Sequence, residues 1–180
     1  MKKELFQEIE IPEGVEISIK DGELTAKGKN GEIKRKFDNY NLVFEKKGNI
    51  IKIGNEKATK KEKKQMNSIT AHIKNIIKGA SENFEYQLKI CFHHFPITVE
   101  LKDKEATIKN FLGEKTPRKL KIPSGVEVTI SQDLISVQSN DKELAGQAAA
   151  NFEKATRIKK RDRRVFQDGI FMINKAGKII

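Results

Sequence analysis

Alternation of apolar and polar residues divides the first third of the chain into short stretches that predict β-strands. A stretch with helical spacing follows, from about Lys60 to Lys78. Thr59 and Glu62 form the capping box expected at the start of this helix, and Gly79 is expected to end it. The predicted strands are Phe6–Ile11, Val15–Lys20, Glu23–Lys27, Ile33–Phe37, Leu42–Glu45 and Ile50–Ile53, and the apolar stripe of the helix is Met66, Ile69, Ile73, Ile76 and Ile77.

The same order of elements returns in the second half, where a helix is predicted from about Asp141 to Thr156 with Asn140 and Glu143 as its capping pair. Short strands followed by one helix, built twice, predict an α+β fold. We expect two tandem duplicated domains, 1–82 and 83–180, each with short antiparallel strands in small sheets packed on one α-helix. The second set of strands is Tyr86–Phe92, Ile97–Lys102, Ala106–Phe111, Lys119–Ile122, Val126–Ile130 and Leu134–Gln138, and the second helical stripe is Leu144, Ala148, Phe152 and Ala155.

Two registers compete to describe the duplication. IPEGVEISI at 11–19 and IPSGVEVTI at 122–130 lie 111 positions apart, but their similarity ends there. A shift of 82 aligns residues 20–32 with 102–114 and gives seven identities in thirteen positions. We therefore predict a period of about 82 and interpret Ile-Pro-x-Gly-Val as one kind of turn used twice. Some twenty residues after the second helix have no counterpart in the first half.

Positive charge is concentrated near the end of the second predicted domain. The chain has 36 Lys and Arg against 25 Asp and Glu, a formal net charge of +11. Residues 154–164, KATRIKKRDRR, hold seven cations and one acid, Asp162. This excess is larger than one helix C-terminus requires, and arginine suits forked contacts with phosphate oxygens. The segment therefore predicts a polyanion-binding site formed by Lys154, Arg157, Lys159, Lys160, Arg161, Arg163 and Arg164.

Two other features leave structural and binding interpretations open. The lysine cluster KATKKEKK, 57–64, lies at a helix N-terminus, where positive charge is unfavourable, so it indicates either a nearby polyanion or a solvated surface. The loop KGKNGEIKRK, 27–36, places Gly28 and Gly31 among lysines. Glycine permits close approach to a phosphate, but hairpins require it as well, and we favour the hairpin.

No motif of a catalytic or metal site is present. Cys91, His93 and His94 are close in sequence, but alternate residues of a strand face opposite sides, so Cys91 and His93 would supply only two ligands. The phosphate-binding loop and the dinucleotide fingerprint are absent. We therefore predict no enzyme activity, no metal and no cofactor.

Aromatic residues are few, with ten Phe, two Tyr and no Trp, and most occupy strand positions. Stacking on bases requires exposed rings, so recognition by phosphate, sugar and shape is expected instead. No apolar run approaches the ~20 residues that span a bilayer, and the N-terminus lacks the apolar core of a signal peptide. Cys91 is the only cysteine, which excludes an internal disulfide. We expect a cytoplasmic protein with no membrane partner.

Three segments resemble one protein family. The segment ELAGQAAANFEKATRIKKRDRRVFQDGIFMINKAGK, 143–178, is similar to the C-terminal signature of the large-subunit ribosomal protein six family in its archaeal and eukaryotic form. Residues 27–37 resemble the family's Gly-x-x-Gly-Glu hairpin, with Lys36 where the family has arginine. Residues 69–99 resemble its interdomain helix and the strand that opens the second domain, with Asn83 where glycine is usual.

The resemblance implies a structural constituent of the large ribosomal subunit that binds large-subunit rRNA chiefly through its C-terminal domain. Its place would be near the sarcin–ricin loop and the base of the stalk, with neighbouring large-subunit proteins as partners and with translational GTPases in weak or indirect contact. The basic segment would grip phosphates, ordered by a turn at Phe166, Gln167, Asp168 and Gly169. Further rRNA contacts are expected at Asn110, Gly113, Lys115, Arg118, Gln147, Asn151, Gln167 and Lys175.

Two alternatives of other classes remain. A metal-dependent nuclease using His93, His94 and nearby acids would cleave nucleic acid when divalent metal is supplied. A stand-alone RNA- or DNA-binding regulator would be found free of ribosomes, whereas a ribosomal protein would co-sediment with large subunits at moderate salt.

Overall fold

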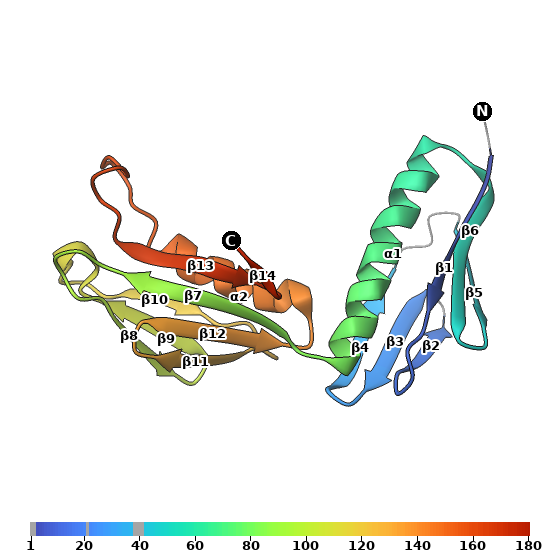
Figure 1. Cartoon of the computed structure of the whole chain (residues 1–180), viewed down its shortest axis with the longest axis horizontal. Coiled ribbons are helices and arrows are strands. Elements are labelled where there is room, and N and C mark those ends of the chain that lie inside the picture. Colours follow the sequence, from blue (N-terminus) through green and yellow to red (C-terminus); the bar gives the residue numbers. More distant parts are fainter. Residues whose placement is uncertain (1–2, 21, 38–41) are drawn as a thin grey trace. The chain divides into compact units, whose positions relative to one another are not determined.

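The chain folds into two compact units (Figure 1), described by a computed structural model that covers residues 3–20, 22–37 and 42–180. The units are Met1–Asn83 and Phe84–Ile180, and each has its own hydrophobic core. Each unit contains small antiparallel sheets and one long helix. The predicted α+β class with two duplicated units is therefore confirmed.

Within its described residues, the first unit contains two three-stranded antiparallel sheets and one helix. One sheet has the order β1-β6-β5 and the other β2-β3-β4. Helix α1 packs on strands from both sheets through its apolar stripe, whose isoleucines are almost fully buried. The elements are β1 (Lys3–Glu10), β2 (Glu16–Lys20), β3 (Glu23–Gly28), β4 (Gly31–Lys36), β5 (Val43–Lys47), β6 (Ile50–Ala58) and α1 (Lys60–Ser81).

Helix α1 begins as predicted but ends later. The backbone N–H of Thr59 donates to the Glu62 carboxylate at 2.8 Å, and the Thr59 hydroxyl accepts in return, which completes the predicted capping box. The prediction that Gly79 ends the helix is wrong, because the helix continues to Ser81. Gly79 lies on the buried face instead, where small residues allow other backbone to approach closely.

The β3–β4 hairpin packs closely against Ala80, the residue that follows Gly79. A methyl group on Gly28 would collide with the carbonyl of Ala80 in the last turn of α1, and the N–H of Asn30 donates to the same carbonyl at 3.3 Å. Gly28 is therefore explained by packing of the hairpin against the helix, in agreement with the structural interpretation favoured from sequence.

The second unit repeats this arrangement and extends one sheet. Its two sheets have the orders β10-β9-β8 and β11-β12-β7-β13-β14, with α2 packed on β7, β10, β12 and β13. The elements are β7 (Phe84–Cys91), β8 (Thr98–Lys102), β9 (Glu105–Lys109), the 3₁₀ turn η1 (Phe111–Gly113), β10 (Arg118–Lys121), β11 (Glu127–Ser131), β12 (Leu134–Ser139), α2 (Lys142–Ala155), β13 (Gly169–Lys175) and β14 (Lys178–Ile179).

The positions of equivalent elements confirm the period of 82. Strand β3 begins at Glu23 and β9 at Glu105, while α1 begins at Lys60 and α2 at Lys142. The competing register is a shared turn, as predicted. Both copies of Ile-Pro-x-Gly-Val place glycine at positive φ, 90° at Gly14 and 84° at Gly125.

The N-cap of α2 differs from the prediction. Asp141, not Asn140, occupies the N-cap position, and its carboxylate accepts the N–H of Glu143 at 2.8 Å. The buried face also lies slightly to one side of the predicted stripe, since Leu144 and Ala155 are only half-buried. The fully buried residues of α2 are Ala145, Ala148, Ala149 and Phe152.

The last twenty residues complete a sheet. Strand β7 pairs with β12 on one side and with β13 on the other, whereas β1, its counterpart, pairs only with β6 within the described part of the first unit. Strands β13 and β14 form a hairpin at Ala176 and Gly177, which have φ values of 50° and 90°. The segment between α2 and β13 is therefore held between two regular elements.

Candidate nucleic-acid interface

The segment 157–168, which we call the basic loop, is fastened at its base by α2. The hydroxyl of Thr156 accepts the N–H of Ile170 at 2.9 Å, and the Glu153 carboxylate accepts the N–H of Met172 at the same distance. These N–H groups lie on the edge of β13 that faces away from β7, and β14 covers that edge only at Asn174 and Lys175. Side chains of α2 thus complete the edge of β13 and hold both ends of the basic loop.

Asp162 organises the turn inside the basic loop. Its carbonyl accepts the N–H of Val165 at 3.2 Å and that of Phe166 at 3.0 Å, and its carboxylate accepts the N–H of Arg164 at 2.9 Å. The turn therefore spans residues 163–165, and the prediction of a turn at Phe166–Gly169 is wrong. Gly169 begins β13 instead.

Arg164 is paired with Asp162, the one acid of the segment 154–164. Its guanidinium lies 2.9 Å from the Asp162 carboxylate, while 90% of its side chain is exposed. This hydrogen bond lowers the pKa of Asp162 below its usual range and raises the pKa of Arg164. Arg164 therefore contributes less free positive charge than the sequence alone indicates.

The other six cations of the segment 154–164 are exposed. Among the residues that the structure describes, none of them forms an ion pair with a carboxylate. Arg161 places its guanidinium 4.8 Å from the centre of the Phe166 ring, a cation–π contact within the loop. These cations are Lys154, Arg157, Lys159, Lys160, Arg161 and Arg163.

Two other loops lie at the same end of the second unit as the basic loop (Figure 1). The Asp168 carboxylate, which is almost fully buried, accepts the backbone N–H of His93 at 3.2 Å. Asn110, in the left-handed conformation, donates from its side-chain amide to the Pro96 carbonyl at 3.0 Å. Asp168 and Asn110 thus join the basic loop, the β7–β8 loop and the β9–β10 loop at one surface.

Arg118 holds the β9–β10 loop against α2. Its Nε and Nη2 donate to the Glu114 carboxylate at 2.8 and 2.5 Å, and its Nη1 donates to the Ala155 carbonyl at 2.7 Å. The guanidinium also lies 4.3 Å from the centre of the Phe111 ring. Since all three nitrogens have internal acceptors, Arg118 positions this loop, and Lys115 is its exposed cation.

The pKa of Glu114 is lowered chiefly by the hydrogen bond from Arg118. The positive charges of Arg118 and Arg161 lower this pKa further. Arg161 belongs to the basic loop, so a charge of this loop lies close enough to act on Glu114 of the β9–β10 loop. Gly113, with φ 75°, completes the bend of this loop.

The remaining predicted contacts lie on α2 and at the far end of β13. Gln147 donates to Asn151 at 2.8 Å, and Asn151 reaches the carbonyl of Lys121 on β10 at 3.4 Å. Gln167 donates to the Arg164 carbonyl at 3.2 Å inside the basic loop. Lys175 is exposed at the opposite end of β13, roughly 20 Å from Gly169 at strand geometry. The structure therefore does not bring Lys175 to the basic loop.

The histidines of the β7–β8 loop do not form a metal cluster. Within residues 3–20, 22–37 and 42–180, no group of three His, Cys, Asp or Glu side chains is arranged to hold a metal ion. His94 packs its ring edge-on against Phe95, with centroids 4.9 Å apart. The geometry therefore gives no support to a metal-dependent nuclease.

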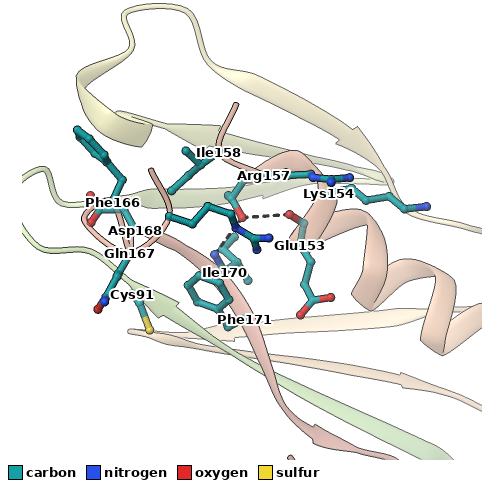
Figure 2. A pocket seen from close by; sticks show the side chains of 12 residues that line it. Cys91, Glu153, Lys154, Arg157, Ile158, Phe166, Gln167, Asp168, Ile170 and Phe171 are labelled. Atoms are coloured by element: carbon teal, nitrogen blue, oxygen red, sulfur yellow. Dashed lines mark hydrogen bonds between the residues drawn. The ribbon is translucent and has the colours of Figure 1, made fainter. Parts of the chain in front are cut away.

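A cavity of about 680 Å³ opens beside the basic loop (Figure 2). Cys91, Ile158, Phe166, Ile170 and Phe171 form its apolar part. Figure 2 shows that these side chains come from β7, the basic loop and β13. The sequence did not indicate this cavity, because β13 was not recognised as a strand.

Exposed aromatic rings were also missed. Phe92, Phe95 and Phe171 are 43%, 40% and 40% exposed. Only Phe92 lies in a predicted strand, and the expectation that rings in strands are unavailable for stacking is wrong for this residue. Alternation along residues 169–175 would have placed Ile170 inward and Phe171 outward once the strand was recognised.

The fold and this surface define a class of protein: a duplicated α+β chain that presents a cationic loop from its second unit. The sequence model of the family described as Ribosomal protein L6 matches residues 11–83 and 95–169. The chain belongs to the ribosomal protein L6 family. This membership confirms the resemblance seen in the sequence and the prediction of a ribosomal protein rather than an enzyme.

Similar proteins from archaea match nearly the whole chain, and each is named Large ribosomal subunit protein uL6. The protein from Methanobrevibacter smithii is 44% identical over 94% of this chain and 95% of its own length. The protein from Methanosarcina mazei is 41% identical over 98% and 100%, and that from Sulfurisphaera tokodaii 40% over 95% and 92%. In the described ranges, neither helix has the length and hydrophobicity required to cross a bilayer.

Proposed function

We propose that this protein is a structural constituent of the large ribosomal subunit and binds large-subunit rRNA chiefly through its second unit. Family membership and the names of the archaeal relatives support the first part. The observation that carries the second part is the segment 154–164, which exposes six cations without carboxylate partners among the described residues. Five of them lie in the basic loop, which is fixed at both ends.

In this proposal the basic loop binds phosphates and the neighbouring loops extend the contact. Arg157, Lys159, Lys160, Arg161 and Arg163 make charge-assisted hydrogen bonds to phosphate oxygens. The Arg164 guanidinium either leaves the Asp162 carboxylate to bind a phosphate, or it contacts the carboxylate and a phosphate together. Contacts of this kind fix the position of the protein on folded RNA without reading its sequence.

The other predicted residues either contact the RNA outside the basic loop or hold the β9–β10 loop in position. Lys115 and the backbone around Gly113 approach the RNA from the β9–β10 loop, while Asn110 and Arg118 hold that loop in position. Gln147 and Asn151 supply polar contacts along α2. Lys175 makes a separate contact at the far end of β13.

The resemblance to the family motifs supports a finer location. We infer that the protein lies on cytoplasmic ribosomes, near the sarcin–ricin loop and the base of the factor-binding stalk. Neighbouring large-subunit proteins are then its other partners, and translational GTPases act close by with weak or indirect contact.

Footprinting of large-subunit rRNA with two matched triple variants tests the proposal. One variant changes Arg161, Arg163 and Arg164 to alanine, and the control changes Lys61, Lys63 and Lys64 of α1 to alanine. Both remove three positive charges from exposed positions. We expect the arginine variant to lose the footprint and the lysine variant to keep it, with thermal stability nearly unchanged in both.

Equal loss in both variants would show that net charge rather than the basic loop drives binding, and would contradict the proposal. Co-sedimentation separates the remaining alternative. A stand-alone regulator leaves the large subunit at moderate salt, whereas the proposed constituent stays bound.

A further inference from the structure

We propose that the cavity beside the basic loop receives one unstacked nucleotide of the bound RNA, an inference that rests on the proposed function of that loop. The cavity, of about 680 Å³, is bounded by the C-terminal end of α2, the basic loop and β13 (Figure 2). Its size lies within the range of about 300–1,000 Å³ typical of sites for small organic molecules.

The inner part of the cavity offers an apolar surface to a planar ligand. Ile158 and Ile170 line it from the basic loop and β13, and Ile170 is only 1% exposed. The Phe171 ring also lines the cavity and is 40% exposed, so one part of the ring has no protein neighbour. An unstacked base placed there would regain on Phe171 the stacking that it loses in the RNA.

Gly169 leaves space for the Phe171 ring at this place. A methyl group on Gly169 would lie 3.1 Å from the ring and 3.6 Å from the Thr156 hydroxyl. The absence of a side chain at position 169 therefore allows the ring to lie close against the backbone of β13. One side of the ring therefore rests on the backbone at Gly169, and its exposed part remains open for stacking.

The charges around the cavity favour an anionic ligand. Glu153 and Asp168 both line it, but each carboxylate accepts a backbone N–H, that of Met172 and that of His93 respectively. Lys154, Arg157 and Arg163 line it as well, and none of them has a carboxylate partner among the residues that the structure describes. A ligand with an apolar planar face and an anionic edge matches this distribution, and a nucleotide has that chemistry.

Four proteins test the inference: wild type, Phe171→Ala, Phe171→Trp and Phe92→Ala. Phe92 is the matched control, because it is as exposed as Phe171 and belongs to the same unit but does not line the cavity. The measurements are affinity for large-subunit rRNA over a range of salt and chemical reactivity of each base in the complex. We expect Phe171→Ala to lower affinity roughly tenfold and to lose protection of a single nucleotide.

The slope of log affinity against log salt should not change in Phe171→Ala, because no phosphate contact is removed. Phe171→Trp should keep the protection, and Phe92→Ala should behave as wild type. If Phe171→Ala keeps every protection and the wild-type affinity, the cavity inference is wrong while the proposed function of the basic loop stands. If the triple arginine variant binds as wild type, the proposed function itself fails.

A second measurement uses the wild-type sequence and does not depend on how the variants fold. Cys91 is half-buried, lines the cavity and is the only cysteine of the chain. Carboxamidomethylation of Cys91 by iodoacetamide adds a group inside the cavity, and we expect it to abolish protection of the same nucleotide without changing the salt slope. Unchanged protection after complete alkylation would overturn the inference.

Titration with free nucleotides shows whether the cavity takes a nucleotide of the bound RNA or a free nucleotide. Methyl NMR signals of Ile158 and Ile170 report on occupancy when AMP, GMP, CMP or UMP is added to the protein. Weak saturable shifts that rRNA suppresses by competition support a nucleotide of the RNA as the natural occupant. Shifts that persist unchanged in the rRNA complex would mean that the cavity takes a free nucleotide, and would overturn the RNA source.

Discussion

The hydroxyl of Thr156 accepts the backbone N–H of Ile170 at 2.9 Å. This hydrogen bond joins the C-cap of α2 to the beginning of β13. The two residues are 3% and 1% exposed, so water does not compete for this hydrogen bond. The basic loop lies between them, and closing its base brings like charges together, which costs free energy through electrostatic repulsion. The buried contact offsets part of that repulsion before any anion binds.

Replacing Thr156 by valine should open the base of the basic loop. Valine has nearly the same shape but leaves the Ile170 N–H without an acceptor in a buried place, which costs about 1–3 kcal/mol of the free energy of unfolding. We expect lower affinity for rRNA as well, since the cations lose their fixed spacing. Denaturant unfolding followed by NMR signals of the second unit measures the first effect.

Thr156→Ser is the control, because serine keeps the hydroxyl that accepts from Ile170 and donates to the Phe152 carbonyl. The serine variant should retain most of the stability and the affinity. Equal losses in the valine and serine variants would mean that the methyl group, rather than the hydrogen bond, holds the loop.

A second prediction concerns Gly28 in the first unit. Gly28→Ala forces a methyl group against the carbonyl of Ala80, so the β3–β4 hairpin must move away from α1. We expect a loss of about 1–3 kcal/mol in the stability of the first unit, as for other overpacked sites. The exposed neighbour Lys29→Ala should change stability little and serves as the control. If Gly28→Ala is as stable as Lys29→Ala but binds rRNA less tightly, the glycine serves phosphate approach after all.

Sequence patterns predicted the features of this fold that depend on nearby residues. The capping box of Thr59 and Glu62 is local chemistry, and the period of 82 follows from identities in adjacent β-strands. The end of α1 was mispredicted because Gly79 lies on the buried face of a helix that continues to Ser81, where the β3–β4 hairpin packs against the adjacent Ala80. No local signal in the sequence reports such a distant contact.

The candidate site was predicted in its charge but not in its geometry. The run of cations is visible in the sequence, whereas the partners that shape it come from distant positions: Asp168 bonds to His93, and Thr156 to Ile170. Arg118 looked like one more phosphate-binding cation, yet its three nitrogens donate to Glu114 and Ala155. Composition alone cannot distinguish an arginine that holds a loop in position from an arginine that binds phosphate.

The ion pair of Glu114 and Arg118 predicts a dependence of stability on pH. The pKa of Glu114 is lowered in the folded state, so the pair contributes stability above the unfolded pKa of about 4.3 and loses it as pH falls through the folded value. Because both side chains are partly exposed, the contribution at neutral pH is at most about 1 kcal/mol. Thermal unfolding of wild type and Glu114→Gln should therefore differ at pH 7 and converge towards pH 3. A difference that grows at acidic pH would contradict this assignment.

The last prediction uses Asp162, the exposed acid of the basic loop. Asp162→Asn keeps a side-chain oxygen that can accept the Arg164 N–H, so the turn at residues 163–165 should survive, but it removes the charge that neutralises Arg164. If the unpaired cations of the segment 154–164 neutralise ~6 phosphates, the log–log slope of affinity against salt is roughly −4 to −5, and releasing Arg164 should make it steeper by about one. Affinity at low salt should rise, in contrast to the usual effect of changing a residue in a binding loop.

The control for this variant is Glu127→Gln on β11, which removes the same charge from the opposite edge of the sheet. Three strand spacings, roughly 14 Å, separate β11 from β13. This exceeds the screening length of about 8–10 Å at ordinary ionic strength, so the control should leave the slope unchanged. If Asp162→Asn instead weakens binding with no loss of stability, Asp162 faces the RNA as a contact of its own, and the basic loop does not act as a purely cationic clamp. Equal gains in affinity for Asp162→Asn and Glu127→Gln would mean that the RNA responds to the net charge of the unit, and that the arrangement of cations set by Asp162 is irrelevant to binding.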